Sequence, residues 1–290
     1  MLIEKNKNVL IVGLGLMGGS YAKGLKKHGF HVCGIARRQD PIDFALAHDI
    51  IDEGYAYTDT DAVSRADILV FALYPKAFMD WINEYQKYLK PGAIITDVTG
   101  VKGCVVYDIQ NILRDDVEFI AAHPMCGREV YGVENSDERM FYGANYIVVP
   151  TDKNTQDAIE VCKDLGRLLG VGRISVLSPE EHDKMIGFVS QLTHVIAVSL
   201  MTCSDNTHLV DYTGDSFRDL TRIARINDTM WSELFSMNKE ALTEQIDVFM
   251  KELGSFRDMI ENSDIEGMRA KMRLSTERRA LFDDKRRPKK

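Results

Sequence analysis

Short apolar runs alternate with amphipathic segments through the first half of the chain. Six runs rich in Val, Ile, Leu and Phe have the length and composition of buried β-strands: Asn8–Val12, His31–Ile35, Ile68–Leu73, Ala93–Thr96, Glu118–Ala121 and Tyr146–Val149. The segments between them have helical spacing, at Met17–His28, Asp43–His48, Lys76–Tyr88 and Cys104–Leu113. Strands that alternate with helices predict a parallel α/β sheet of the Rossmann type.

A change of pattern marks the end of this part. A helix over Thr155–Leu169 and a strand over Ile174–Leu177 are expected to complete it. Ser178 then has the features of a helix N-cap, because Pro179 occupies the first turn and Glu181 completes a capping box.

Glycine and proline placement supports the same boundary. From 180 to 287 there is no proline, and only four glycines interrupt the sequence, which predicts long helices. We therefore expect an α/β domain over 1–177 and an all-α domain over 178–290. Within the second domain, Val195–Met201 is apolar almost all round and is predicted to be buried.

Composition and charge limit the possible partners. The 290 residues carry a net charge of −8, which argues against nucleic acid as the main partner. The basic tail 285–290 is expected to be a solvated terminus. Five scattered cysteines without a C-x-x-C pair predict neither disulfides nor a metal site, and favour the cytoplasm. Apolar runs such as Val195–Met201 are too short to span a membrane, so no membrane association is expected.

A glycine-rich turn follows the first predicted strand. Gly13, Gly15 and Gly18 form G-x-G-x-x-G, with Leu16 and Met17 between the last two glycines. Such a turn lets the backbone approach a pyrophosphate, and the following helix offers its N-terminal N–H groups to the anion. The strand–turn–helix context predicts a dinucleotide site.

The end of the second strand bears on the choice between NAD and NADP. An acidic residue there would bind the ribose 2′-hydroxyl of NAD. This chain has Ala36-Arg37-Arg38, and no acid occurs until Asp40. The guanidinium groups of Arg37 and Arg38 favour a 2′-phosphate, hence NADP, although side chains that merely flank the adenine or face solvent remain an alternative.

Two loops should lie at the carboxyl ends of strands, where open α/β sheets bind ligands: 97–102 and 121–129. His123 is held on a stiff backbone by the following Pro124, which suits a general base. A structural histidine is the alternative, and a nucleophilic pair with Cys126 lacks an orienting group nearby.

The helix after Glu181 carries a polar stripe. Asp183, Gly187, Ser190, Gln191 and His194 follow helical spacing, so they need either a ligand or an internal hydrogen-bond network. Further on, an arginine cluster could hold a carboxylate or form a solvated face: Arg218, Arg222 and Arg225.

Together these motifs resemble the prephenate dehydrogenase family, with its arogenate and cyclohexadienyl relatives, over residues 8–280. The resemblance rests on five motifs in order: 13–20 (GLGLMGGS), Asp97 with Val101-Lys102, His123-Pro124-Met125 with Gly127 and Glu129, Ser190-Gln191-Leu192 with His194, and Phe217, Asp219 and 221–224 (TRIA) followed by Met230-Trp231.

The resemblance implies an enzyme of tyrosine biosynthesis that oxidises and decarboxylates prephenate, or arogenate, with a nicotinamide cofactor. His123 matches the family's catalytic histidine, Arg222 the arginine that binds a substrate carboxylate, and His194 a second histidine on the substrate side. Ser190 and Gln191 match the same substrate-side motif. The resemblance also implies that 1–177 is the dinucleotide-binding Rossmann domain and that 178–290 is the substrate and dimerisation domain, because the helical half of such enzymes forms a homodimer.

Three differences from the family pattern affect these expectations. Thr99-Gly100 stands where the family usually has Gly-Ser, so Thr99 is the expected substitute for the serine that assists catalysis. Thr193 replaces the usual proline before the second histidine. The residues after Leu281 leave no room for the regulatory domain of some members, so feedback by tyrosine through such a domain is not expected.

Two other functions fit parts of the pattern. A two-domain oxidoreductase for a β-hydroxyacid or imino acid shares the general plan, but typically places a lysine on the first long helix of the helical domain, where the Ser190–His194 stripe has none. A protein that only senses a dinucleotide would keep the glycines without needing both His123 and Arg222.

Overall fold

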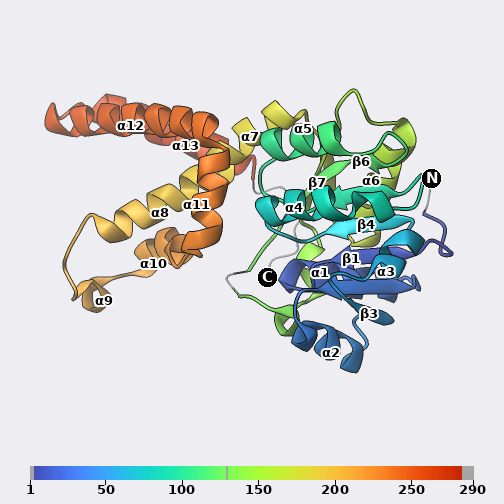
Figure 1. Cartoon of the computed structure of the whole chain (residues 1–290). Helices are drawn as coiled ribbons and strands as arrows, with labels where there is room; N and C mark the ends of the chain where they lie inside the picture. Colours follow the sequence, from blue (N-terminus) through green and yellow to red (C-terminus); the bar gives the residue numbers. More distant parts are fainter. Residues whose placement is uncertain (1–2, 129, 283–290) are drawn as a thin grey trace.

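A six-stranded parallel sheet forms the centre of the N-terminal part in the computed structural model, which describes residues 3–128 and 130–282 (Figure 1). Its strands lie in the order β3-β2-β1-β4-β5-β6. Their bounds are β1 Val9–Val12, β2 Val32–Ala36, β3 Glu53–Ala56, β4 Ile68–Phe71, β5 Ile94–Asp97 and β6 Glu118–Phe119. The chain reverses its direction of travel across the sheet between β3 and β4, which creates the crevice where such sheets bind ligands.

Alternating side chains of β1 explain why both faces of this sheet are covered. Val9 and Ile11 join one buried apolar cluster, and Leu10 and Val12 join another. The first cluster includes side chains of α1 Leu16–Lys27, α2 Gln39–Ala47 and α6 Gln156–Leu168. The second includes side chains of α3 Thr60–Arg65, α4 Pro75–Tyr85 and α5 Gly103–Ile112; the 3-10 turn η1 Gln86–Tyr88 extends α4. A strand buried on both faces must be apolar throughout, as β1 is.

A second, three-stranded sheet adjoins β5. Strand β7 (Ala121–Met125) pairs antiparallel with β8 (Asn145–Val149), which pairs parallel with β9 (Arg173–Val176). Two 3-10 turns, η2 Val133–Asn135 and η3 Glu138–Phe141, connect β7 to β8. The sequence predicts one strand over Glu118–Ala121, but the chain instead leaves the first sheet after Phe119 and starts β7. His123 therefore lies within a strand, opposite Ile147, rather than at a strand end.

The C-terminal part is entirely helical in the described residues and lies to one side of the sheets (Figure 1). Its elements are α7 Pro179–Ile186, the π-helical turn η4 Gly187–Gln191, α8 Leu192–Thr202, α9 Leu209–Tyr212, α10 Asp215–Thr221, the 3-10 turn η5 Arg222–Ala224, α11 Asp228–Met237, α12 Lys239–Glu261 and α13 Ile265–Ala280. The predicted capping box is present, because the Ser178 hydroxyl and the Glu181 carboxylate each accept the other residue's N–H. The predicted long helices of the proline-free region are also present, among them α12 and α13.

Some N-terminal elements differ from those expected. Strand β3 and helix α3 were not predicted, and α2 begins at Gln39 rather than Asp43. Strand β3 lies at the edge of its sheet and none of its side chains is buried, so it shows no apolar alternation. The start of α2 contains Pro41 in its first turn, where a proline is tolerated.

The expectation that Val195–Met201 is buried is wrong for a single chain. Only Ala197 is buried, and Met201 is 42% exposed. The continuous helix Pro179–Thr202 is also long and apolar enough, by length and composition, to cross a membrane, and 28% of its most apolar stretch is buried. Its exposed apolar side chains therefore need a covering that residues 3–128 and 130–282 do not provide.

Candidate active site

The turn after β1 is shaped by Gly13 and Gly18. Gly13 has φ +104°, which side chains rarely adopt, and its N–H donates to Ile35 O at 2.9 Å. A Cβ on Gly18 would lie 1.9 Å from Gly13 O, so α1 packs against the turn only if this position is glycine. These two residues perform the steric roles that the sequence motif predicts.

The N-terminus of α1 is open to a ligand. A Cβ on Gly15 would meet nothing within 4 Å. No side chain caps the helix at Gly15, and its first turn, which includes Leu16 and Met17, has no acidic residue. The geometry thus fits a dinucleotide pyrophosphate, which would accept hydrogen bonds from these first backbone N–H groups.

Arg37 and Arg38 follow β2 directly, and both are exposed. Arg38 occupies the N-cap position of α2, and Asp40 lies in the first turn of that helix. The carboxyl end of β2 therefore presents two guanidinium groups where the ribose of a dinucleotide would lie.

A buried ion pair lies behind the loop after β5. The side chains of Lys102 and Asp97 are fully buried, and Lys102 Nζ lies 2.6 Å from Asp97 Oδ2. Lys102 Nζ also donates to Ala122 O at 2.7 Å, and Ala122 N–H donates to Asp97 Oδ1 at 3.0 Å. These bonds fix β7 immediately before His123.

Thr99 belongs to the same buried cluster. Its hydroxyl accepts from Lys102 Nζ at 3.1 Å and lies within hydrogen-bond distance of Asp97 Oδ2 and Val101 O. Only 4% of Thr99 is exposed. Thr99 is thus linked through Lys102 to Ala122, the residue before His123. A role of its hydroxyl in catalysis stays a prediction.

His123 is linked to a second histidine that the sequence analysis did not identify. His123 Nδ1 lies 2.9 Å from His182 Nε2, and His182 Nδ1 lies 2.7 Å from Asp183 Oδ1. The Asp183 carboxylate also accepts the backbone N–H groups of Lys102 at 2.8 Å and Gly103 at 2.7 Å. His182 and Asp183 lie on α7, so this helix contacts both strand β7 and the first turn of α5.

Burial lowers the pKa of both histidines. The pKa of His123 is well below its usual value, first because of burial and then because of His182 and the Lys102 ammonium. The pKa of His182 is lowered by burial and by Lys102, although the Asp183 carboxylate opposes this change. Both rings are therefore neutral near neutral pH, as a base that accepts a proton must be.

The polar stripe along α7, η4 and α8 divides into two groups. Asp183 and Gln191 belong to an internal network, in which Asn238 Nδ2 donates to Asp183 O at 2.9 Å and to Gln191 Oε1 at 2.6 Å. Gln191 Nε2 donates to Leu234 O at 3.2 Å. Asp183 and Gln191 thus belong to an internal hydrogen-bond network, one of the two alternatives for the stripe, and binding of substrate by Gln191 stays a prediction.

Ser190 and His194 are less buried. His194 Nδ1 lies 2.9 Å from Ser190 O, and the His194 ring lies against Trp231, with centroids 3.7 Å apart and ring planes tilted by 31°. The π-helical turn η4 contains Ser190 and shifts the stripe relative to regular helical spacing. Arg222 begins η5, which packs against α8, so the arginine lies on an element adjoining the helix of His194.

Glu129 of the family motif and the basic tail 285–290 lie outside the described residues.

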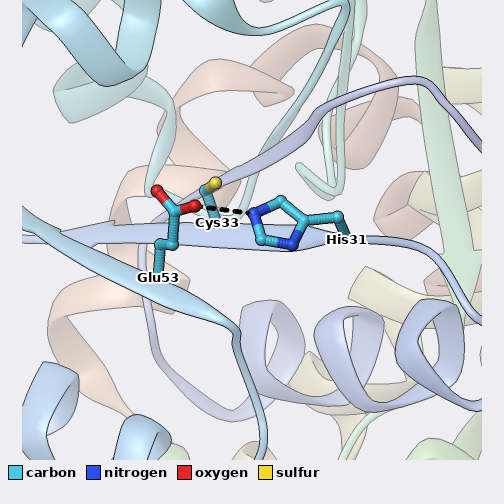
Figure 2. Close-up of side chains that lie close together, drawn as sticks. All are labelled: His31, Cys33 and Glu53. Atoms are coloured by element: carbon cyan, nitrogen blue, oxygen red, sulfur yellow. Dashed lines mark hydrogen bonds and ion pairs between the residues drawn. The ribbon is translucent and has the colours of Figure 1, made fainter.

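His31, Cys33 and Glu53 form a separate group close enough to hold a metal ion (Figure 2). His31 Nε2 lies 2.9 Å from Glu53 Oε1, and Glu53 is also contacted by the Tyr55 hydroxyl and by Arg65 at 3.6 Å. Burial and Glu53 raise the pKa of Cys33 to about 11. The group lies at the amino ends of β2 and β3, opposite the cofactor edge, and its carboxylate is already bound by protein donors, so we assign no metal to it.

His182 was missed because its partner is distant in sequence. His123 and His182 are 59 residues apart, and Asp183 lies 81 residues from Lys102. The available signal was the pair His182-Asp183 one turn after the capping box, at the start of a helix whose stripe had already been identified. Nothing in that pattern predicts the contact with β7.

Comparisons with known proteins agree with this geometry. Residues 21–175 match the family model of the prephenate dehydrogenase nucleotide-binding domain, and residues 178–274 match that of the prephenate dehydrogenase dimerization domain. The chain is 30% identical over 274 residues to a prephenate dehydrogenase of Bacillus subtilis, covering 91% of this chain and 73% of the relative. It is 31% identical over 275 residues to one of Lactococcus lactis, covering 90% and 73%.

A solved structure shows the same arrangement. The prephenate dehydrogenase of A. aeolicus in complex with hydroxyphenyl propionate and NAD+ is 31% identical, with a TM-score of 0.88 over 97% of this chain and 99% of that chain. The fold of this chain, with its glycine-rich turn and its helical half, is thus that of a known prephenate dehydrogenase. The chain belongs to the prephenate dehydrogenase family of nicotinamide-dinucleotide-dependent oxidoreductases.

Proposed function

We propose that this enzyme oxidises and decarboxylates prephenate to 4-hydroxyphenylpyruvate in tyrosine biosynthesis. The observation that carries the proposal is His123, a neutral, hydrogen-bonded imidazole on strand β7, which adjoins β5. Relatives of 30% and 31% identity that are named prephenate dehydrogenases favour this substrate over arogenate, the alternative.

In the proposed reaction His123 accepts the proton of the substrate's ring hydroxyl as the carbon that bears it loses a hydride. A nicotinamide dinucleotide held at the glycine turn and the N-terminus of α1 would supply the hydride acceptor. The resulting ketone would then lose its ring carboxylate as CO₂, and the electron pair of the broken C–C bond would make the ring aromatic. The former ketone oxygen would take up a proton and become the phenol hydroxyl of the product. Arg222 would bind a substrate carboxylate, and His194, Ser190 and Gln191 would line the substrate side. Thr99 would act through Lys102 and the strand that carries His123.

The domain division and assembly are proposed on the same basis. We place the boundary between 177 and 178, where Ser178 caps α7. The exposed apolar side chains of α8 would be covered in a homodimer, as the dimerization-domain match suggests. Such an enzyme would act in the cytoplasm on a small-molecule substrate, without nucleic acid or membrane partners.

The activity test is direct. The purified protein should reduce the nicotinamide cofactor with prephenate, and four reactions decide the finer points: prephenate or arogenate, each with NAD or NADP. Faster turnover with arogenate would replace the proposed substrate by the alternative. Absence of cofactor reduction in all four reactions would contradict the proposed function.

Cofactor choice is tested at the end of β2. We propose NADP as the preferred cofactor, because Arg37 and Arg38 can bind a 2′-phosphate. Changing both to alanine should raise the KM for NADP by about 10-fold or more, since hydrogen bonds to a charged group each contribute about 1.5–3 kcal/mol. The KM for NAD should change little. Equal losses with the two cofactors would show that the arginines do not read the 2′-phosphate.

Arg222 is tested by its effect on substrate affinity. Arg222→Ala should raise the KM for prephenate by about 10- to 100-fold through loss of a charge-assisted bond to a carboxylate. The matched control is Arg65→Ala, which removes a guanidinium at the amino edge of the sheet, near Glu53. An unchanged KM in Arg222→Ala would place the substrate carboxylate elsewhere.

A further inference from the structure

The hydrogen bonds around His182 determine where its protons lie. The Asp183 carboxylate accepts two backbone N–H groups as well as His182, at a helix N-terminus, so it is present as the anion. Its oxygen can only accept from His182 Nδ1, which must carry a proton. Since the buried ring is neutral, His182 Nε2 then holds a lone pair.

The same reasoning extends to His123. The lone pair on His182 Nε2 requires a donor, and His123 Nδ1 is the atom that faces it at 2.9 Å. His123 therefore carries its proton on Nδ1. A neutral imidazole has one N–H, so His123 Nε2 is left as the acceptor.

We propose that His182 and Asp183 are positioning residues, which hold His123 as its Nδ1–H tautomer so that an unprotonated Nε2 faces the substrate hydroxyl. This inference rests on the proposed role of His123 as the base. Neither residue was among the expected site residues for catalysis, and both act through His123 rather than on the substrate.

The chain also stabilises the product of proton transfer. When His123 Nε2 takes the hydroxyl proton, the ring becomes an imidazolium, and its Nδ1–H still donates to His182. His182 in turn donates to the Asp183 anion, so the new positive charge is bonded through one ring to a fixed negative charge. The charged groups around the pair are Lys102 on the loop before α5, Asp97 at the end of β5 and Asp183 on α7. Asp97 is already paired with Lys102, which leaves Asp183 as the carboxylate that serves the histidines.

Two variants of His182 separate positioning from simple packing. His182→Leu fills a similar volume without a polar atom, so His123 loses the acceptor that fixes its proton. In His182→Gln the side-chain carbonyl can still accept from His123 Nδ1–H, although the link to Asp183 is lost. The matched control is His31→Gln, which removes a histidine paired with Glu53 far from the cofactor edge.

The tautomer is measured by proton–nitrogen correlation spectra of the protein with isotope-labelled histidine, in which His123→Asn assigns the signal among the 7 histidines. The wild type and His182→Gln should show the Nδ1–H form of His123, and His182→Leu should show a mixture or the Nε2–H form. An Nε2–H form in the wild type, or an unaltered Nδ1–H form in His182→Leu, overturns the proposal. These spectra need no turnover, so they decide the tautomer even if the proposed function fails.

Steady-state kinetics give the second measurement. His182→Leu should lower kcat by about 10- to 100-fold, within the range of losses when a base is held in the wrong tautomer, and His182→Gln should lose less. The KM for both substrates should change less than about 3-fold, since neither variant removes a binding group. An active wild type with a His182→Leu variant of equal kcat overturns the positioning role while leaving the proposed function intact.

Discussion

Replacing His123 with asparagine should lower kcat by about 100- to 10,000-fold, the range attributed to a positioned general base. The asparagine amide can occupy the place of Nδ1 and donate to His182, so the buried chain to Asp183 persists. What disappears is the Nε2 atom that would accept the hydroxyl proton. The loss should therefore fall on kcat, with little change in dinucleotide affinity.

The two quantities are measured separately. Turnover gives kcat, and titration of the dinucleotide against intrinsic protein fluorescence gives its Kd. The control is His31→Gln, which should retain both values. A His123→Asn enzyme whose kcat stays within about 3-fold of the wild type would remove His123 from the reaction.

The lowered pKa of His123 has its own pH signature. Its pKa in the folded protein is well below the usual 6.5, so the base stays neutral as the pH falls through 6.5. The acidic decline of kcat/KM should thus lie below that pH. The same shift affects stability. As the pH falls below 6.5, His123 takes up a proton in the unfolded chain but not in the folded protein, so the free energy of unfolding decreases.

Replacing Lys102 with methionine should destabilise the protein by about 3–5 kcal/mol, the cost of leaving a buried charge without its partner. Lys102 loses its bonds to Asp97, Thr99 and Ala122, and the fully buried Asp97 keeps its charge or must take up a proton. Since whole domains are stable by about 5–15 kcal/mol, this loss is a large part of the total.

A double variant shows whether the pair is the cause. Lys102→Met combined with Asp97→Asn removes both charges, and the amide oxygen can still accept the Ala122 N–H. The double variant should unfold at a higher urea concentration than Lys102→Met alone, at one fixed protein concentration because the enzyme is proposed to be a dimer. Strictly additive losses would show that the two charges do not stabilise each other.

Local sequence patterns predicted the elements that carry the cofactor site. Strand β1 is apolar at every position because each face of the sheet covers alternate residues, and the glycine spacing follows from close backbone approach. Edge strand β3 was not predicted because it pairs with a single strand, β2, and none of its side chains is buried. Helical spacing placed His194 in the polar stripe and Arg222 in the arginine cluster, but their roles toward the substrate came from the family resemblance.

Long-range contacts account for what could not be predicted at the site. The pairing of His123 with His182 depends on how α7 packs against β7, and no spacing rule relates two residues on separate elements. Likewise, the exposure of Met201 depends on the outer surface of α8, which a helical pattern cannot assign to a partner or to solvent. Amphipathic periodicity shows which face of a helix is apolar, but not which part of the protein or which partner covers that face.

Helix α7 belongs to the proposed second domain, yet its first turns hold three groups of the first: the His123 ring and the backbone N–H groups of Lys102 and Gly103. These hydrogen bonds connect the two proposed domains across the boundary at Ser178. A hinge rotation that separated the two domains would break them and release the proton of His123 from its fixed position. In the proposed mechanism, any separation of the two domains would therefore also disable the base, so an opened enzyme would bind the dinucleotide without being able to turn over.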